Sequence, residues 1–205
     1  MSKLYFKYGC MGSSKSAQAL ITKFNYEERD MKVWLLKPSI DTRFDSSLTL
    51  DGKSSIRSRI GLRSEATVIR ESTNILDEFL IKTSTHVEFH DSDISVIIVD
   101  ESQFLSEEQI DQLRVIASKY NTPVICYGLR TDFQTKLFPG SKRLLEVADS
   151  IEEIKTMCKC GRKATVNARV NPDGSLITEG EQVVLGANDL YVPYCYSCYM
   201  SLKEK

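Results

Sequence analysis

Apolar segments recur along most of the chain, and polar segments separate them. Leu4–Tyr8 alternates apolar and polar side chains, whereas Val33–Pro38, Ile94–Val99 and Pro123–Gly128 are almost continuously apolar. Continuous apolar runs of this length are typical of parallel strands that are buried on both faces. Apolar residues at helical spacing lie between these strands: Ala17, Leu20, Ile21 and Phe24; Ile75, Leu76, Phe79 and Leu80; Ile110, Leu113, Ile116 and Ala117. The alternation predicts an α/β fold in which helices flank a parallel sheet.

Weaker patterns add further elements to this prediction. Thr67–Ile69 predicts a short strand, residues 144–147 predict a helix, and Ile151–Met157 predicts a last strand of the sheet. Ser106–Gln109 resembles a capping box, which predicts the start of the third helix. The polar segment 44–59 predicts a loop, and two interpretations of it stay open: a solvated connection, or a lid near bound phosphates.

The first strand leads into a small-residue loop, Gly9–Ser16, and then into a helix. This order of strand, loop, Lys-Ser and helix is typical of a phosphate-binding P-loop, whose backbone N–H groups surround phosphate oxygens. Lys15 would reach the terminal phosphates and the Ser16 hydroxyl would ligate Mg²⁺. Ser14 stands where the pattern usually has glycine, so an ordinary turn remains the alternative interpretation.

Two carboxylates, Asp100 and Glu101, end the most apolar strand. In P-loop enzymes, a hydrophobic strand that ends in aspartate lies beside the P-loop and holds Mg²⁺. The alternative is that both residues only open the next loop. The segments 39–43 and 129–134 also follow strands, at the end of an α/β sheet where ligands bind.

Four cysteines near the C-terminus form two close pairs, Cys158 with Cys160 and Cys195 with Cys198. Two such pairs are typical of a zinc site, and four cysteine ligands leave no open position, so this zinc would be structural. Disulfides or free thiols are the alternative. Between the pairs, a strand over 165–170, a turn over 171–174 and a strand over 182–186 predict a hairpin too short for a core of its own. We therefore expect two domains, 1–157 and 158–205.

Composition limits the classes of function. The chain has 205 residues, 41% of them hydrophobic, with a net charge of −1 and a pI near 6.2. This charge disfavours general binding to nucleic acid or to an anionic membrane. We find no apolar run of membrane-spanning length and no signal-peptide pattern, so we expect a cytoplasmic protein whose cysteines are reduced.

With these features in place, the whole chain resembles the type II, zinc-containing thymidine kinases. The motifs that carry the resemblance follow one another along the chain: residues 9–16, 25–29, 41–43, 58–62, 100–104, 127–133 and 180–186, Tyr191 and the four cysteines. The resemblance implies a RecA-like P-loop domain and a small zinc-binding lasso domain that covers the nucleoside. It also implies transfer of the γ-phosphoryl group of ATP to the 5′-hydroxyl of thymidine, which gives dTMP.

The resemblance assigns a role to individual residues. Glu101 would be the general base, and Ser16 and Asp100 would hold Mg²⁺. The phosphates of ATP would lie against these residues: Gly9, Cys10, Met11, Gly12, Ser13, Ser14, Lys15, Ser16, Asp41, Thr42, Arg43, Asp100 and Gln103. The nucleoside would contact a second set, which includes the lasso: Met11, Phe104, Leu129, Phe133, Gln182, Val183, Val184, Leu185, Gly186 and Tyr191. Zinc would be held by Cys158, Cys160, Cys195 and Cys198.

The implied partners are ATP and thymidine, with dTTP as a feedback inhibitor and a homotetramer as the assembly. Two alternatives stay open. The first is a P-loop ATPase whose zinc ribbon binds nucleic acid, but residues 158–205 hold six Lys or Arg against five Asp or Glu, without the basic excess that such binding needs. The second is a nucleotide-binding homologue that lost catalysis through Ser14, against which stand Lys15, Ser16, Asp100 and Glu101.

Overall fold

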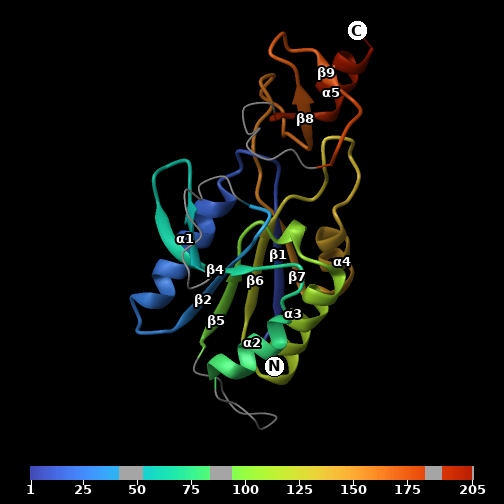
Figure 1. Ribbon diagram of the computed structural model, residues 1–205. Coiled ribbons are helices and arrows are strands. Elements are labelled where there is room, and N and C mark those ends of the chain that lie inside the picture. The colour runs from blue at the N-terminus through green and yellow to red at the C-terminus, as the bar shows by residue number, and fades with distance from the viewer. Residues whose placement is uncertain (42–52, 84–93, 183–190, 205) are drawn as a thin grey trace.

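The computed structural model describes residues 1–41, 53–83, 94–182 and 191–204, which form a large sheet and a smaller one (Figure 1). The large sheet has seven strands in the order β3-β4-β2-β5-β6-β1-β7. Its strands are β1 Leu4–Tyr8, β2 Val33–Pro38, β3 Lys53–Arg57, β4 Arg63–Ile69, β5 Val96–Val99, β6 Val124–Gly128 and β7 Ser150–Glu153. β3 is antiparallel to β4, and the other neighbouring pairs are parallel.

Helices cover both faces of this sheet. They are α1 Lys15–Glu27, α2 Ile75–Thr83, the 3-10 helix η1 Ser102–Phe104, α3 Glu107–Lys119 and α4 Pro139–Val147. Since successive strand residues point to opposite faces, β5 gives Ile97 and Val99 to the core under α2, α3 and α4. Its Val96 and Ile98 join the core under α1. All four are buried, so the prediction of a central strand is confirmed.

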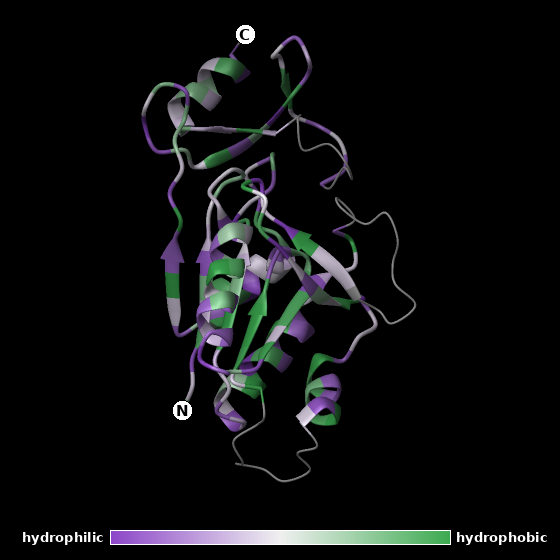
Figure 2. Ribbon diagram, turned by 90° about the vertical axis from the view of Figure 1, so that its left-hand side faces the viewer, coloured by the Kyte–Doolittle hydropathy of each residue, from purple (hydrophilic) through white to green (hydrophobic). Residues whose placement is uncertain are grey.

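The carboxyl ends of the parallel strands meet at one edge of the sheet, as parallel pairing requires. The loops that begin at Gly9, Ser39, Asp100 and Leu129 start at this edge. The C-terminal part of the chain lies beyond it, at the opposite end of the molecule from the N-terminus (Figures 1 and 2). The sheet therefore brings the segments with candidate functional residues together under the C-terminal part.

The C-terminal part is a three-stranded antiparallel sheet with one helix. Its elements are β8 Val166–Val170, β9 Leu176–Ile177, β10 Tyr191–Tyr194 and α5 Tyr196–Lys203, and β8 lies in the centre. Val166, Ala168 and Val170 on one face of β8 pack with Tyr199 of α5 in a small core. The strand of the predicted hairpin therefore buries its apolar face with the help of α5, which follows the hairpin in the chain.

Three predictions of secondary structure need correction. Residues 53–57, expected to be loop, form β3, and β4 begins at Arg63 rather than at Thr67. β7 ends at Glu153 instead of Met157. The strand that follows the turn after β8 lies at Leu176–Ile177 rather than at 182–186, of which 183–186 lie outside the described residues.

Local signals at the helix starts agree with the structure. In α3, Ser106 Oγ accepts a hydrogen bond from the Gln109 amide (3.1 Å) and Gln109 Oε1 accepts one from the Ser106 amide (3.2 Å), so the capping box is confirmed. α4 begins at Pro139, whose missing N–H costs nothing in the first turn. Among the described helices, none combines the length and the apolar character needed to cross a lipid bilayer.

Candidate functional site

The loop between β1 and α1 has the tight geometry of a phosphate-binding loop. At Gly9, a Cβ would lie 2.4 Å from the Ile154 carbonyl oxygen and 2.5 Å from Ser13 Oγ, so only glycine fits there. Gly12 has a φ of 76° in the left-handed region, where glycine is favoured. The loop then enters α1 at Lys15, which points the first free N–H groups of the helix toward the loop.

Ser14 is the departure from the usual glycine, and the structure gives it a left-handed backbone with a φ of 64° and a ψ of 20°. A side chain in this conformation costs about 1–2 kcal/mol per residue. The Ser14 side chain is exposed and makes no capping hydrogen bond to α1. Its carbonyl oxygen accepts the first helical hydrogen bond, from the Gln18 amide (2.9 Å). The cost of the departure is therefore backbone strain at the helix entrance.

Lys15 lies inside the loop, with its side chain 7% exposed. Its Nζ donates hydrogen bonds to the carbonyl oxygens of Gly9 (3.0 Å) and Cys10 (2.9 Å) and lies 3.4 Å from Ser13 Oγ. The ammonium group is thus held at the centre of the loop, where the terminal phosphates of a nucleotide would lie. Burial raises the pKa of the Cys10 thiol, which keeps this neighbour neutral.

The two carboxylates that end β5 are both buried, Asp100 at 2% and Glu101 at 6% exposure. Glu101 has a left-handed φ of 53°, an unusual conformation that occurs often at functional sites. Gln103 donates a hydrogen bond from Nε2 to Glu101 Oε2, and its Oε1 accepts one from the Leu129 amide (3.0 Å). Gln103 therefore fixes the Glu101 carboxylate against the loop after β6. Gly128 permits this contact, because a Cβ there would lie 2.9 Å from Gln103 Oε1.

Asp41, which follows β2, belongs to a buried ion pair that the sequence analysis did not predict. Its Oδ2 lies 3.6 Å from Lys37 Nζ, and the two side chains are 7% and 1% exposed. Lys37 Nζ also lies 3.4 Å from Ser54 Oγ of β3. A lysine within an apolar strand was the available signal for this pair. Thr42 and Arg43, predicted beside Asp41, lie outside the described residues.

The residues predicted to contact a nucleoside come from three segments. Phe104 packs edge-on against Phe138, with ring centroids 5.6 Å apart. Phe133, after β6, is 1% exposed. The Arg169 guanidinium lies over the Phe133 ring and also near the ring of Tyr191 in β10. Gln182 donates a hydrogen bond to Asp132 Oδ2 (2.8 Å). Residues 183–186 lie outside the described part of the chain.

The four cysteines of the C-terminal part form a compact cluster. The sulfur atoms of Cys158, Cys160, Cys195 and Cys198 all lie within 4.8 Å of one another, and those of Cys160 and Cys195 are 3.6 Å apart. A tetrahedral zinc ion with Zn–S bonds of about 2.3 Å requires sulfurs about 3.8 Å apart. The donor set and its spacing therefore fit Zn²⁺, with no position left for a substrate.

The electrostatics of this cluster also favour a cation. A hydrogen bond from the Arg162 guanidinium (Nε to Sγ, 3.4 Å) lowers the pKa of Cys160 to about 6. The adjacent sulfurs of Cys195 and Cys160 raise the pKa of Cys198 to about 12. Thiolates this close repel one another, so a bound Zn²⁺ is what would allow all four to ionise.

Comparison with known proteins identifies the family. The family model described as thymidine kinase matches residues 2–199. The chain belongs to the thymidine kinase family. The thymidine kinase of Haemophilus influenzae is 44% identical over all of this chain and 98% of its own length. That of Shewanella oneidensis is 44% identical over 95% of each chain, and that of Enterobacteria phage T4 is 42% identical over 100% of this chain and 99% of its own.

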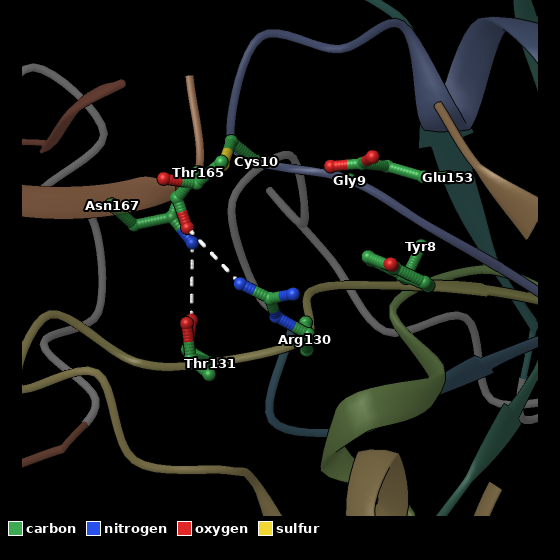
Figure 3. Close-up of a pocket in the computed structure, with 8 residues that line it drawn as sticks. All are labelled: Tyr8, Gly9, Cys10, Arg130, Thr131, Glu153, Thr165 and Asn167. Atoms are coloured by element: carbon green, nitrogen blue, oxygen red, sulfur yellow. Dashed lines mark hydrogen bonds between the residues drawn. The ribbon is translucent and has the colours of Figure 1, made fainter. Parts of the chain in front are cut away.

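In this member of the thymidine kinase family, β8 supplies two buried polar residues that the motifs did not indicate. Asn167 is 3% exposed; its Oδ1 accepts a hydrogen bond from the Met11 amide (2.8 Å) and its Nδ2 donates one to the Thr131 carbonyl (3.0 Å). Figure 3 shows Asn167 between the P-loop and the loop after β6, beside Cys10 and Arg130. The cavity drawn there offers about 10 Å³ to the centre of a water molecule, so it holds one water at most.

Arg169 is the second of these residues. It is 4% exposed, and its side chain points to the same face of β8 as Asn167 because the two are separated by one residue. The pattern of the strand, with Val166, Ala168 and Val170 on the other face, indicates a second buried face. Its partners lie far away in the sequence, so no local motif could reveal it.

Proposed function

We propose that this chain catalyses the transfer of the γ-phosphoryl group of ATP to the 5′-hydroxyl of thymidine. Thymidine phosphorylation follows from membership of the thymidine kinase family, and thymidine kinase is the name of its relatives. The observation that carries the chemistry is the Glu101 carboxylate, buried at the end of β5 and held by Gln103 against the loop after β6. A carboxylate fixed in this way can accept the proton that the 5′-hydroxyl loses as its oxygen attacks the γ-phosphorus.

The other residues would position and neutralise the phosphates. Lys15 would exchange its hydrogen bonds with Gly9 and Cys10 for contacts to the β- and γ-phosphates of ATP. The Ser16 hydroxyl and the Asp100 carboxylate are hard oxygen donors and would hold Mg²⁺. When bound, Mg²⁺ would neutralise charge on the phosphates during the transfer. The products are dTMP and ADP.

The rival functions have less support. A nucleotide-binding homologue without catalysis would have no need of a buried, hydrogen-bonded Glu101, and the strain at Ser14 is confined to one exposed residue. A zinc ribbon that binds nucleic acid would need a clear excess of basic side chains, but residues 158–205 hold six Lys or Arg against five Asp or Glu, and one of the six, Arg169, is buried. We therefore retain thymidine phosphorylation as the function.

The finer expectations from the family remain proposals. We propose that four cysteinates bind a structural zinc and that 1–157 and 158–205 are the two domains. A homotetramer as the assembly is likewise a proposal from the family resemblance. Inhibition by dTTP and a cytoplasmic location stay predictions.

The order of substrates tests this function. We expect kcat/KM at fixed ATP and Mg²⁺ to fall from thymidine to deoxyuridine and then, much further, to deoxycytidine. The 5-methyl group fits the apolar recess expected around Met11, Leu129 and Tyr191 and is worth about 1 kcal/mol, or roughly fivefold. Backbone groups that pair with the edge of thymine would be mismatched by cytosine, at about 1–3 kcal/mol each.

An assay that couples ADP release to NADH oxidation measures all three nucleosides. Omission of the nucleoside gives the background ATPase rate, and this rate must be subtracted. Comparable activity on deoxycytidine would refute the proposed recognition of the base, and ADP release that no nucleoside stimulates would refute the kinase itself.

A further inference from the structure

Arg169 is a buried cation in the centre of the C-terminal sheet. It lies on β8 between β9 and β10, opposite Ile177 on one side and Tyr191 on the other. Its guanidinium is not solvated, since the residue is only 4% exposed. A buried charge is costly unless other groups replace its water, so the contacts of this side chain show what the fold uses it for.

The guanidinium replaces water with one aromatic face and three hydrogen bonds. Its central carbon lies 3.9 Å from the centroid of the Phe133 ring, a stacking distance. Nε and Nη2 both donate to the hydroxyl oxygen of Tyr191, at 3.0 and 2.6 Å. Nη2 also donates to the Glu181 carbonyl oxygen at 2.7 Å. One side chain thus contacts three segments: the loop after β6, the segment after β9, and β10.

We propose that Arg169 is a positioning residue of the nucleoside site, which it orders by fixing Phe133 and Tyr191 relative to each other. This inference rests on the proposed thymidine phosphorylation, in which both aromatic residues contact the nucleoside. Phe133 belongs to the P-loop domain and Tyr191 to the C-terminal part, and Arg169 contacts both. The planar fork of arginine suits this position, because lysine can neither stack on a ring nor donate in two fixed directions.

The hydrogen bonds also determine whether the Tyr191 hydroxyl can act as a donor or as an acceptor toward a further partner. Its oxygen has two lone pairs and accepts two N–H groups of Arg169. The hydroxyl can therefore only donate to a further partner, such as an oxygen atom of the nucleoside. Arg169 in this way makes Tyr191 a donor and aligns it, without touching the substrate itself.

Calorimetric binding of thymidine in the absence of ATP tests this role in the full-length, zinc-loaded protein. We expect Arg169→Met to weaken thymidine binding by about tenfold or more, since it loses both the stack and the hydrogen bonds. Arg169→Lys keeps the charge and a long side chain, and we expect it to recover less than half of this loss on a logarithmic scale. The dissociation constant of ATP should change by less than about threefold in both variants.

Tyr191→Phe supplies the coupling test. Because Arg169 acts partly through the Tyr191 hydroxyl, removal of this hydroxyl should weaken thymidine binding less in Arg169→Met than in the unaltered chain. Arg143→Met is the matched control: Arg143 pairs with Asp111 and Glu146 on the surface, away from the site. We expect this control to bind thymidine and ATP as the unaltered protein does.

Zinc content and melting temperature separate positioning from folding. A variant that retains one zinc per chain and melts cooperatively, yet binds thymidine weakly and ATP normally, supports the inference. Thymidine affinity within threefold of the unaltered value in both Arg169 variants overturns it, as does equal loss of thymidine and ATP affinity. Failure of the unaltered chain to bind thymidine overturns the proposed function and this assignment with it.

Discussion

Two residues at the phosphate end of the site have left-handed backbones, Ser14 with a φ of 64° and Glu101 with a φ of 53°. Neither is glycine, and such a conformation costs about 1–3 kcal/mol at each residue. The two differ in their surroundings: Glu101 is buried and hydrogen-bonded to Gln103, whereas the Ser14 side chain is exposed. The strained backbone at Glu101 thus carries a side chain that a hydrogen bond holds in the site. The strained backbone at Ser14 carries a side chain with no such contact, so relief of that strain should not affect the chemistry.

Glu101→Gln should lower kcat about 10²–10⁴-fold, because the amide cannot accept the proton of the 5′-hydroxyl. The amide oxygen can still accept the hydrogen bond from Gln103, so thymidine affinity should stay within a few-fold. Steady-state kinetics and calorimetry measure the two effects. Glu108→Gln, on the exposed side of α3, is the control. A turnover rate close to that of the unaltered protein would exclude Glu101 as the base.

Ser14→Gly should raise or preserve both stability and ATP affinity. Glycine removes about 1–2 kcal/mol of left-handed strain but loses about 0.5–1 kcal/mol of chain entropy on folding, so the net gain is small. Asp30→Gly is a matched control, because Asp30 is exposed after α1 with a φ of 57°. We expect it to change the melting temperature similarly and leave ATP binding unchanged. Strongly weakened ATP binding in Ser14→Gly would show instead that the serine side chain is itself a ligand.

At the scale of elements, the sequence predicted those that combine a strong pattern with central burial. β2, β5 and β6 are continuous apolar runs, and the structure buries them between neighbouring strands. The sequence predicts a loop where β3 lies, because Ile56 is the one apolar residue of this strand; the structure buries Ile56 together with Ser54. Pro193 kept the sequence pattern from predicting β10, since proline in a sheet occurs mainly in edge strands; among the described strands, β10 pairs only with β8.

The residues of the site likewise divide into those that the sequence predicts and those that it does not. Residues 9–16, 100–101 and the four cysteines stand in contiguous motifs whose chemistry can be read from spacing alone. Asn167 and Arg169 could not be identified from the sequence, because their roles depend on partners that are distant along the chain. Met11, for example, is 156 residues from Asn167. Only the side-chain contacts between β8 and the P-loop domain show that two residues of one strand face the site.

At the scale of the whole molecule, the zinc site and the P-loop are coupled through β8. Asn167 accepts the Met11 amide hydrogen bond, and the hydrophobic surroundings of Cys158 and Cys195 include Cys10 of the same loop. The P-loop is therefore bounded on one side by the C-terminal part. If zinc holds that part together, its removal should disturb the P-loop as well as the nucleoside end of the site.

We expect purified protein to contain one zinc per chain, and chelation to release it with four reactive thiols. Loss of the Asn167 contact, worth about 0.5–1.5 kcal/mol, should make the Met11 amide exchange with solvent roughly fivefold faster and should weaken ATP binding. Hydrogen exchange read by mass spectrometry or NMR measures this effect without any turnover.

Asn167→Ala separates the contact from the metal. With zinc still bound, this variant should reproduce the faster exchange at Met11, because the acceptor of that amide is lost while the zinc site stays intact. Asn171→Ala is the matched control, since Asn171 follows β8 in the same hairpin and its side chain donates a hydrogen bond to Ser175 there, not to the P-loop. If the Met11 amide stays equally protected after zinc is removed, the P-loop does not depend on the C-terminal part, and the zinc serves only the segment that it encloses.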